Sequence, residues 1–247
     1  MRLTRLFVPG ELQAGATIDL PADTAAHIVK VLRARSGDAI ILFNGGGTEC
    51  LGAIDTVRGS RVSVLLQEAR AIDRESPLAV TLVQAIPRGD RMDFVVQKAT
   101  ELGVARIVPV LSARSVVRLN ERQHASKLEH WRGVAISACE QCGRNRLPLI
   151  DAPRELIDHL GAPAAAGTTR WVLDPECAPA PHLAIPQGPV EVTIGPEGGF
   201  APEELDAMRV AGLAGLRLGP RILRTETAAL AALTWLQTRH GDMSPTL

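Results

Sequence analysis

The sequence predicts an α/β protein built from a small β-rich domain and a larger, mostly parallel sheet with flanking helices. In the first seventy residues, short apolar runs are separated by glycines, which is typical of a small β barrel. From residue 78 onward, similar runs alternate with segments of helical length, the pattern of a parallel sheet covered by helices. A polar stretch at 73–77 separates the two patterns. We therefore expect one domain over residues 1–72 and a second over residues 73–247.

The first domain is predicted to hold several short strands and one helix. The helix begins near Pro21, with Asp23 or Thr24 as its N-terminal cap, and ends at about Ala34. The glycines after Asn44 predict a flexible hairpin tip rather than a nucleotide motif. The predicted strands are Leu6–Val8, Ala39–Phe43, Cys50–Val57 and Arg61–Gln67.

The second domain is predicted to alternate strands with helices. Its strands are Leu78–Ile86, Arg106–Leu111, Arg170–Leu173, Val190–Ile194 and Leu216–Leu218. Its helices are Arg88–Leu102, Glu121–Cys142, Arg154–Leu160, Pro202–Ala211 and Thr225–Arg239. The last helix is apolar on most sides, so it is expected to be buried in its own domain or against a partner.

The charge of the chain is balanced overall but unevenly distributed. There are 27 basic and 27 acidic residues, so no global field attracts nucleic acid. Residues 84–146 hold eleven basic and six acidic residues, whereas residues 147–247 hold seven and twelve. This asymmetry fits one anion-facing surface, although charges that alternate around a solvated surface would give the same counts. Only three basic residues are lysines, and the planar guanidinium of arginine suits phosphate binding and stacking.

The chain is expected to be cytoplasmic and to need no metal. It has no run of 18 apolar residues, and its first residues lack the hydrophobic stretch of a signal peptide. Four cysteines are too few for a disulfide scaffold at this length. Cys139 and Cys142 form a Cys-x-x-Cys, but they lie in a predicted helix without a second pair or paired histidines. A zinc or redox site is therefore disfavoured.

Two glycine-rich runs each follow a predicted strand. Residues 194–200 have the sequence IGPEGGF, and residues 218–228 have the sequence LGPRILRTETA. In an open α/β sheet, ligands bind beyond the carboxyl ends of the strands, where glycines allow the backbone to approach a ligand closely. Either run alone is more often a plain turn, but the pair predicts one shared binding site.

Together these runs resemble the signature of the 16S rRNA uracil(1498)-N(3)-methyltransferase family, ribosomal small subunit methyltransferase E, within the SPOUT superfamily. The similarity extends over nearly the whole chain. Further segments similar in kind are residues 5–8, 31–33, 37–38, 98–104, 114–117 and 138–144. One departure is Ala26-His27, where the family often has two adjacent histidines, so no catalytic role is expected for His27.

The resemblance implies an enzyme that methylates uridine N3 of 16S rRNA, at position 1498 in the family, within the assembled small ribosomal subunit. The implied cofactor is S-adenosylmethionine, which brings its own activated methyl group and needs no metal. The resemblance also implies a PUA-like RNA-binding domain at the N-terminus, a trefoil knot near the C-terminus, and a homodimer whose active sites are completed at the subunit interface.

The resemblance places the cofactor pocket in three loops, at Leu173–Glu176, Gly195–Phe200 and Leu218–Arg224. Without the resemblance, the leucines and the isoleucine of these loops would be interpreted as ordinary core residues. The expected cofactor-binding residues are Leu173, Gly195, Pro196, Glu197, Gly198, Gly199, Leu218, Gly219, Ile222, Leu223 and Arg224.

Methylation of uracil N3 requires a base to remove the N3 proton or a cation to stabilise the anion that results. The expected catalytic residues are Glu140, Arg144, Glu197 and Arg224, with Arg221 and Glu226 as further candidates. Their spacing alone favours an exposed ion pair between Glu140 and Arg144 on one helix face, and an N-terminal helix position for Glu226. The resemblance instead favours catalytic roles for Glu140 and Arg144.

RNA contacts are expected from basic residues in both domains: Arg5, Arg33, Arg35, Arg88, Arg91, Lys98 and Arg114. The chain has four phenylalanines, three tryptophans and no tyrosine, so aromatic stacking on bases is limited. Phe200 is the aromatic residue next to the predicted site. The Phe200 side chain is expected either to stack on a base or to be buried behind the loop.

Two other functions remain open at this point. One is a related knotted methyltransferase that acts on tRNA or on a ribose hydroxyl. The other is a non-catalytic RNA-binding or ribosome-assembly protein that keeps the fold.

Overall fold

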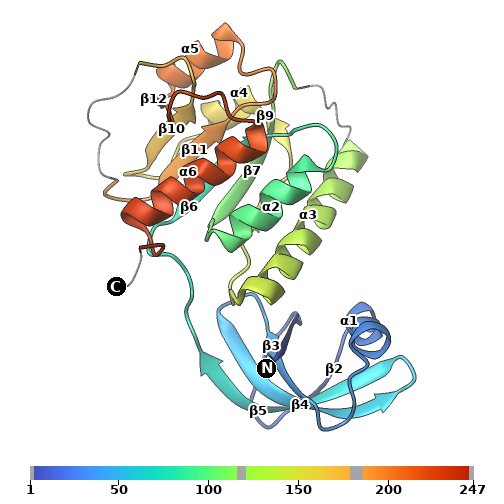
Figure 1. Ribbon diagram of the computed structural model, residues 1–247. Coiled ribbons are helices and arrows are strands. Elements are labelled where there is room, and N and C mark those ends of the chain that lie inside the picture. Colours follow the sequence, from blue (N-terminus) through green and yellow to red (C-terminus); the bar gives the residue numbers. More distant parts are fainter. Residues whose placement is uncertain (1–2, 116–120, 179–185, 245–247) are drawn as a thin grey trace. The chain divides into compact units, whose positions relative to one another are not determined.

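The computed structural model describes residues 3–115, 121–178 and 186–244. The chain forms two compact units, one made of Met1–Glu75 with Ile136–Leu147, the other of Ser76–Ala135 with Pro148–Leu247. The first unit contains a mostly antiparallel sheet and the second contains a parallel sheet with flanking helices (Figure 1). The predicted α/β fold class is confirmed.

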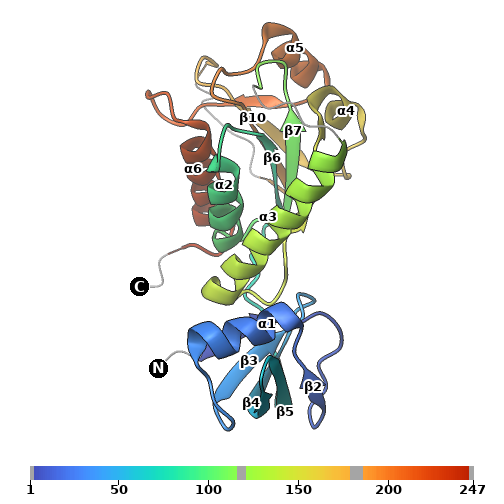
Figure 2. The same ribbon diagram turned by 90° about the vertical axis from the view of Figure 1, so that its right-hand side faces the viewer.

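The first unit is built on a five-stranded sheet in the order β1-β3-β4-β5-β2. Its strands are β1 (Thr4–Phe7), β2 (Thr17–Asp19), β3 (Ala39–Phe43), β4 (Thr48–Arg58) and β5 (Arg61–Ala71). β1 pairs with β3 in parallel, and the other pairs are antiparallel. The long β4–β5 hairpin forms the centre of the sheet (Figure 2).

Gly52 allows the β4–β5 hairpin to bend. The register between these strands shifts at Leu51/Gly52, and a Cβ on Gly52 would lie 2.7 Å from the Leu65 carbonyl oxygen. Such a contact is too short for any other residue, so glycine is required at this bulge. Alternating residues such as Leu42 and Val64 are fully buried on one face and form the core of this unit.

The helix of the first unit differs in detail from its prediction. α1 spans Ala22–His27 and continues as a π-helix, η1, over Ile28–Leu32. Pro21 occupies the N-cap position and no side chain caps the helix, so the predicted caps at Asp23 and Thr24 are wrong. Proline suits a helix start because its φ is already set and the first N–H groups have no helical partner.

The second unit is built on a seven-stranded sheet with the order β12-β10-β11-β6-β7-β8, while β9 pairs with β7. All its pairings are parallel. Its strands are β6 (Val80–Ala85), β7 (Arg106–Leu111), β8 (Leu149–Ile150), β9 (Arg154–Glu155), β10 (Thr169–Leu173), β11 (Val190–Ile194) and β12 (Ala214–Leu216).

Helices cover both faces of this sheet, and each face has its own core. The helices are α2 (Arg91–Glu101), α3 (Glu121–Cys142), α4 (Leu156–Gly161), α5 (Pro202–Val210) and α6 (Thr225–His240). Leu82 packs in the core shared with α2, α3 and α6, whereas the next residue, Val83, packs in the core shared with α4 and α5. Figures 1 and 2 show α2 and α6 side by side on one face and α5 on the other. This two-sided burial explains why the strands are continuous apolar runs.

Several predicted boundaries move in the second unit. α2 begins at Arg91 rather than Arg88, and β12 ends at Leu216 rather than Leu218. Arg154–Glu155 is a short strand that precedes α4, not the start of that helix. α6 extends to His240, and its Ala229, Ala232 and Leu233 are fully buried, so the predicted burial of this helix is confirmed within its own unit.

A buried cluster of charged side chains connects distant segments of the first unit. Arg5 donates to Glu49 at 2.5 Å and to the side-chain oxygen of Asn145 at 2.6 Å. Its guanidinium also lies 5.0 Å from the centre of the Phe43 ring. Burial alone would raise the pKa of Glu49, but hydrogen bonds from Arg5, Asn145 and Arg74 outweigh it, so the pKa lies below its ordinary value. Glu49 is therefore an ionised partner at neutral pH.

We predict that Arg5→Ala destabilises the protein by about 3 kcal/mol, because it leaves the Glu49 carboxylate buried and incompletely paired. Urea unfolding followed by circular dichroism measures this loss. Arg70→Ala is the matched control, since Arg70 pairs with Glu68 at 2.6 Å on the surface, with 41% of its side chain exposed. The control is expected to leave stability nearly unchanged, because solvent screens this exposed pair. Equal effects of the two substitutions would contradict the role given to Arg5.

Candidate active site

Three loops leave the second sheet at the same edge. β12, β10 and β11 are neighbouring parallel strands, with Leu173 opposite Leu216 and Val172 opposite Thr193. Their carboxyl ends are therefore level. The first loop (Leu173–Glu176), the second loop (Gly195–Phe200) and the third loop (Leu218–Arg224) begin at or just beyond these ends. This edge is where parallel α/β sheets bind ligands.

The second loop is a tight turn supported by Phe200. The Gly199 N–H donates to the Pro196 carbonyl at 2.9 Å, and Gly199 has a φ of +68°, which favours glycine. Phe200 is 8% exposed, and its ring would lie 3.1 Å from a Cβ on Gly195. Phe200 is thus buried behind the loop, and it offers no free face for stacking on a base.

Glu197 fastens the second loop to the start of α2. Its carboxylate accepts a hydrogen bond from Arg91 at 2.5 Å and one from the Arg88 backbone N–H at 3.2 Å. Burial alone would raise the pKa of Glu197, but the N–H groups of Glu197 and Arg88 and the Arg91 guanidinium outweigh it, so the pKa lies below its ordinary value. The carboxylate is therefore ionised at neutral pH and is a weak proton acceptor.

Arg114 holds the second loop from another element. Its guanidinium donates to the Gly198 carbonyl at 3.1 Å. A Cβ on Gly198 would meet only the Arg114 side chain and carbonyl, at 3.5 Å or more, so the turn itself has room for a side chain there. The second loop is consequently held at Glu197 and at Gly198 by arginines that follow two neighbouring strands, β6 and β7.

The third loop presents both buried and exposed side chains. Leu218 and Leu223 are partly buried against the core under α2, α3 and α6. Between them Gly219 has a φ of +72°, and Ile222 is 85% exposed. Arg221 and Arg224 are exposed, and the Arg224 carbonyl accepts from the Ala228 N–H at 2.7 Å in the first turn of α6. An apolar side chain as exposed as Ile222 is a candidate ligand contact.

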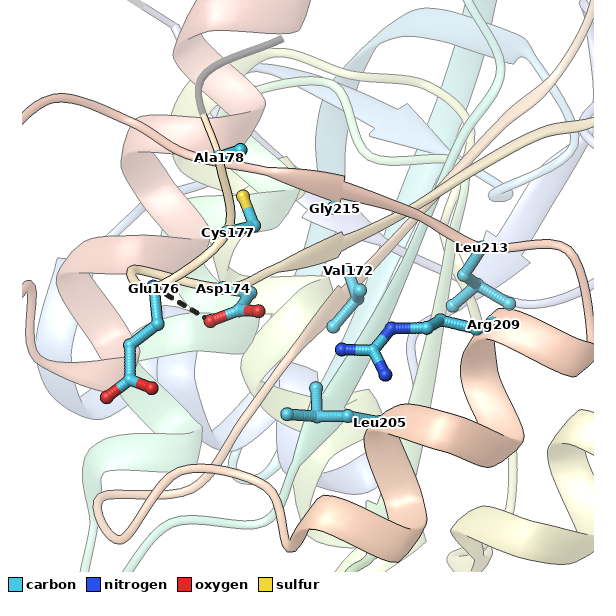
Figure 3. Close-up of a pocket in the computed structure, with 9 residues that line it drawn as sticks. All are labelled: Val172, Asp174, Glu176, Cys177, Ala178, Leu205, Arg209, Leu213 and Gly215. Carbon is cyan, nitrogen blue, oxygen red and sulfur yellow. Dashed lines mark hydrogen bonds between the residues drawn. The ribbon is translucent and has the colours of Figure 1, made fainter.

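The first loop borders a hollow between the end of β10 and α5. Its volume is about 430 Å³, within the range of small-molecule sites. Figure 3 shows Asp174 and Glu176 on the loop side and Leu205 and Arg209 on the side of α5. The Glu176 N–H donates to Asp174 at 2.9 Å, which fixes the start of the loop.

Thr225 and Gln84 belong to this site, although neither was predicted. The Thr225 hydroxyl donates to the Gly195 carbonyl at 2.6 Å and accepts from Gln84 at 2.8 Å. The only sequence signal for Gln84 is a polar residue inside the apolar run of β6. Thr225 lies inside the LGPRILRTETA run, but that run does not reveal its partner.

Glu140 and Arg144 belong to the first unit. Glu140 accepts a hydrogen bond from the Phe7 backbone N–H at 3.0 Å, and the Arg144 side chain, 6% exposed, pairs with Glu75. The exposed position that their spacing favours is wrong for Arg144, because its side chain is buried and pairs with Glu75. Their catalytic roles stay predictions.

The basic residues expected to contact RNA differ in exposure. Arg33, Arg35, Arg88, Arg91 and Arg114 are exposed. Lys98 is partly buried and pairs with Glu101 at 2.8 Å. Arg5 is 8% exposed and its guanidinium is occupied within the first unit, so it presents no free donor surface to RNA.

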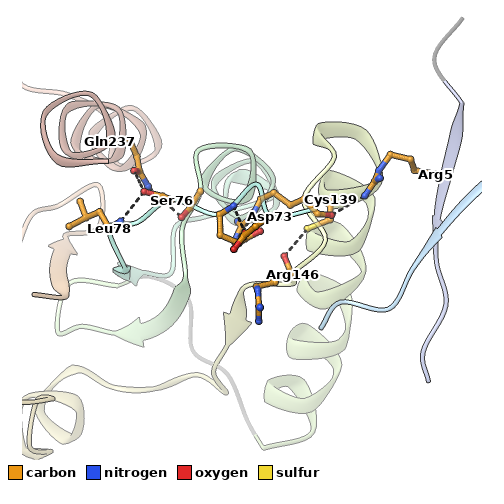
Figure 4. A network of polar contacts seen from close by, with 10 residues as sticks. Arg5, Asp73, Ser76, Leu78, Cys139, Arg146 and Gln237 are labelled. Atoms are coloured by element: carbon orange, nitrogen blue, oxygen red, sulfur yellow. Dashed lines mark hydrogen bonds and ion pairs between the residues drawn. The ribbon is translucent and has the colours of Figure 1, made fainter. Parts of the chain in front are cut away.

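Cys139, the first residue of the Cys-x-x-Cys, has the properties of a structural cysteine. Interaction with Cys142 and burial raise the pKa of the Cys139 thiol, so it stays protonated and is a poor nucleophile or metal ligand. Cys139 instead approaches the Arg146 carbonyl at 3.6 Å (Figure 4). Within the described ranges, no cluster of three His, Cys, Asp or Glu side chains is placed to hold a metal ion. No helix within those ranges is long and apolar enough to cross a membrane.

Comparison with known proteins adds independent information. The model of an RNA methyltransferase domain matches residues 74–237, and that of an RNA methyltransferase PUA domain matches residues 20–65. Ribosomal RNA small subunit methyltransferase E of Buchnera aphidicola subsp. Schizaphis graminum is 32% identical, with 98% of this chain and 99% of the relative covered. The enzyme of the same name from Bacillus subtilis is 31% identical, with 91% of each chain covered.

A solved structure extends the likeness to three dimensions. The crystal structure of a ribosomal RNA small subunit methyltransferase E from Neisseria gonorrhoeae, bound to S-adenosylmethionine, superimposes with a TM-score of 0.93 at 37% identity. The match covers 98% of this chain and 100% of that one. Fold, loops and domain matches together define an RNA methyltransferase of SPOUT type with a PUA-like domain. The chain belongs to the ribosomal RNA small subunit methyltransferase E family.

We predict that Arg91→Met raises the pKa of Glu197 toward its ordinary value, because the substitution removes the guanidinium that stabilises the carboxylate. Carbon-13 NMR of labelled glutamate side chains measures the titration. Arg88→Ala is the matched control, since Arg88 contributes its backbone N–H and alanine keeps that group. A Glu197 titration that stays unchanged in Arg91→Met, or shifts equally in Arg88→Ala, would contradict this attachment of the loop.

Proposed function

We propose that this protein transfers the methyl group of S-adenosylmethionine to N3 of a uridine in 16S rRNA, position 1498 in the family's numbering, within the assembled small ribosomal subunit. The observation that supports the proposal is the meeting of three loops at the carboxyl edge of β12, β10 and β11, in a chain of this family. The proposed location is the cytoplasm, where ribosomes are assembled.

The three loops fit the proposed methyl donor. Gly199 and Gly219 have left-handed φ values and open space where a Cβ would stand, so their backbone groups are accessible to adenine or ribose. Ile222 supplies an exposed apolar surface. Leu218 and Leu223 of the same loop and Leu173 of the first loop are partly buried. Pro196 and Gly195 complete the proposed cofactor-binding set together with Glu197, Gly198 and Arg224. When bound, S-adenosylmethionine supplies an electrophilic methyl group on sulfur.

The protein must then prepare the acceptor. Uracil N3 is a poor nucleophile until its proton is removed or its anion is stabilised, and a positioned base contributes about 10² to 10⁴-fold. The lowered pKa of Glu197 makes it a weak base, so we assign Glu197 to shaping the cofactor loop. We propose that Arg224, exposed at the end of the third loop, stabilises the uridine anion. Catalytic roles for Glu140 and Arg144 are proposed from the family resemblance alone.

RNA binding is proposed for the arginines that surround the second loop. Arg88, Arg91 and Arg114 are exposed, and the side chains of Arg91 and Arg114 already contact the loop at Glu197 and Gly198. Phosphate contacts need only basic groups in register, so this surface can position the rRNA backbone beside the loop. Arg33, Arg35 and Lys98 remain proposed contacts, whereas the buried Arg5 is left out.

The remaining features follow from the family and are proposed with it. They are a trefoil knot in the second domain and an isologous homodimer whose active sites are completed at the interface. A domain boundary between residues 72 and 73 is proposed from the polar stretch at 73–77. No metal takes part in the proposed reaction, because the cofactor carries an activated methyl group.

We predict that the protein binds S-adenosylmethionine and that Gly198→Val weakens this binding about tenfold or more, because a valine side chain keeps the ligand from the loop backbone. Isothermal titration calorimetry measures the affinity. Gly133→Val is the matched control, since Gly133 lies exposed on α3 with open space around it. No binding to the wild-type protein would favour the non-catalytic RNA-binding function. Wild-type affinity in a folded Gly198→Val variant would remove the second loop from the site.

We also predict that deletion of the gene removes 3-methyluridine from 16S rRNA, and that the purified protein restores it on small subunits isolated from the deletion strain. Nucleoside analysis by mass spectrometry measures the modification, and free 16S rRNA tests whether the assembled subunit is needed. If 3-methyluridine persists while a tRNA or ribose methylation disappears, the related knotted methyltransferase activity is the correct one.

A further inference from the structure

A chain of buried hydrogen bonds connects two of the three loops. The Thr225 hydroxyl, at the first residue of α6, donates to the Gly195 carbonyl at 2.6 Å. Gln84, near the end of β6, donates to the same hydroxyl at 2.8 Å. Thr225 is 4% exposed and Gln84 is fully buried, so water competes little for these groups.

The direction of each bond in this chain is fixed by chemistry. A backbone carbonyl only accepts hydrogen bonds, so the hydroxyl of Thr225 gives its single proton to Gly195. That hydroxyl must then accept from Gln84, which has to present its amide nitrogen. The second proton of this nitrogen goes to the Ala85 carbonyl at 2.8 Å. The Gln84 amide therefore cannot flip without losing both bonds.

The Thr225 hydroxyl serves the loop rather than its own helix. Threonine is common at helix starts, where its oxygen usually accepts from the first N–H groups of the helix. Here Arg224 holds the N-cap position, and no side-chain cap hydrogen bond forms at the start of α6. The hydroxyl donates instead to a carbonyl 30 residues away in the chain.

The hydrogen bond between Thr225 and Gly195 joins the end of the third loop to the start of the second. Gly195 is the first residue of the second loop, and its other side is set by the Phe200 ring, 3.1 Å from a Cβ placed on Gly195. Thr225 directly follows Arg224, the last residue of the third loop. A hydrogen bond between them fixes the spacing between the end of the third loop and the start of the second.

We propose that Thr225 is a positioning residue for the cofactor loops: its hydroxyl ties the end of the third loop to the start of the second. This inference rests on the proposed function, because it takes these loops as the place where S-adenosylmethionine binds. Thr225 acts through the Gly195 carbonyl, and Gln84 acts by orienting the Thr225 hydroxyl.

The test compares three threonine variants of the full-length protein. Thr225→Val keeps the shape of the side chain but removes the hydroxyl, and Thr225→Ser keeps the hydroxyl. Thr100→Val is the matched control, since Thr100 is also fully buried and its hydroxyl donates to the Val96 carbonyl at 2.8 Å within α2. Calorimetry gives the Kd for S-adenosylmethionine, thermal unfolding gives stability, and steady-state kinetics on small subunits give the two KM values.

Thr225→Val is expected to raise the Kd and the KM for S-adenosylmethionine about tenfold, while the KM for the small subunit changes less than about twofold. Thr225→Ser is expected to restore the Kd to within about twofold of the wild-type value. Thr100→Val lowers stability but keeps the wild-type Kd. A folded Thr225→Val protein with wild-type affinity, or an equal loss in Thr100→Val, would overturn the inference.

A second variant covers the case in which Thr225→Val does not fold. Gln84→Met keeps the volume of the side chain but removes the donor that orients the Thr225 hydroxyl. It is expected to raise the Kd about threefold, and an unchanged Kd would contradict the inference. Failure of the proposed function is distinct from these outcomes, because the wild-type protein itself would then show no binding of S-adenosylmethionine.

Discussion

The parallel register of β12, β10 and β11 is the constraint on which the candidate active site depends. Because these strands are neighbours and run in one direction, their carboxyl ends are level, and the three following loops begin at one edge. Residues 173, 195 and 218 come together only through this pairing. Both faces of the sheet are covered by helices, which keeps the strands buried and their ends fixed.

Contacts from other elements then give the second loop its shape. The Arg91 guanidinium and the Arg88 N–H hold Glu197, Arg114 holds the Gly198 carbonyl, and Thr225 holds the Gly195 carbonyl. These groups come from segments after β6 and β7 and from the start of α6, so one loop of six residues is fixed by three elements. A ligand that binds to a loop already held in place loses less conformational entropy on binding. This arrangement also explains why Glu197, a conspicuous carboxylate, is better suited to holding the loop than to proton transfer.

The sequence predicted the parts of this arrangement that depend on local pattern. Continuous apolar runs such as Val190–Ile194 indicated buried parallel strands, and the glycines at 195–199 and 219 indicated loops at their ends. Strands of two or three residues, such as β2, β8 and β9, carry too little pattern to be seen. Long-range pairing was also invisible: Arg5 was expected on the RNA surface, but it is buried against Glu49 and an asparagine 140 residues away. Gln84 and Thr225 were missed for the same reason, because neither residue reveals its partner locally.

We propose that the three loops form one cradle for an S-adenosylmethionine-like ligand. Hydrogen–deuterium exchange with and without S-adenosylhomocysteine tests it most directly, because the ligand slows exchange of amides that it contacts or orders. We expect slowed exchange in all three loops, Leu173–Glu176, Gly195–Phe200 and Leu218–Arg224, with Gly133 and its neighbours in α3 unchanged. Slowed exchange confined to one loop, or located only on α5 away from the other two, would contradict a shared cradle.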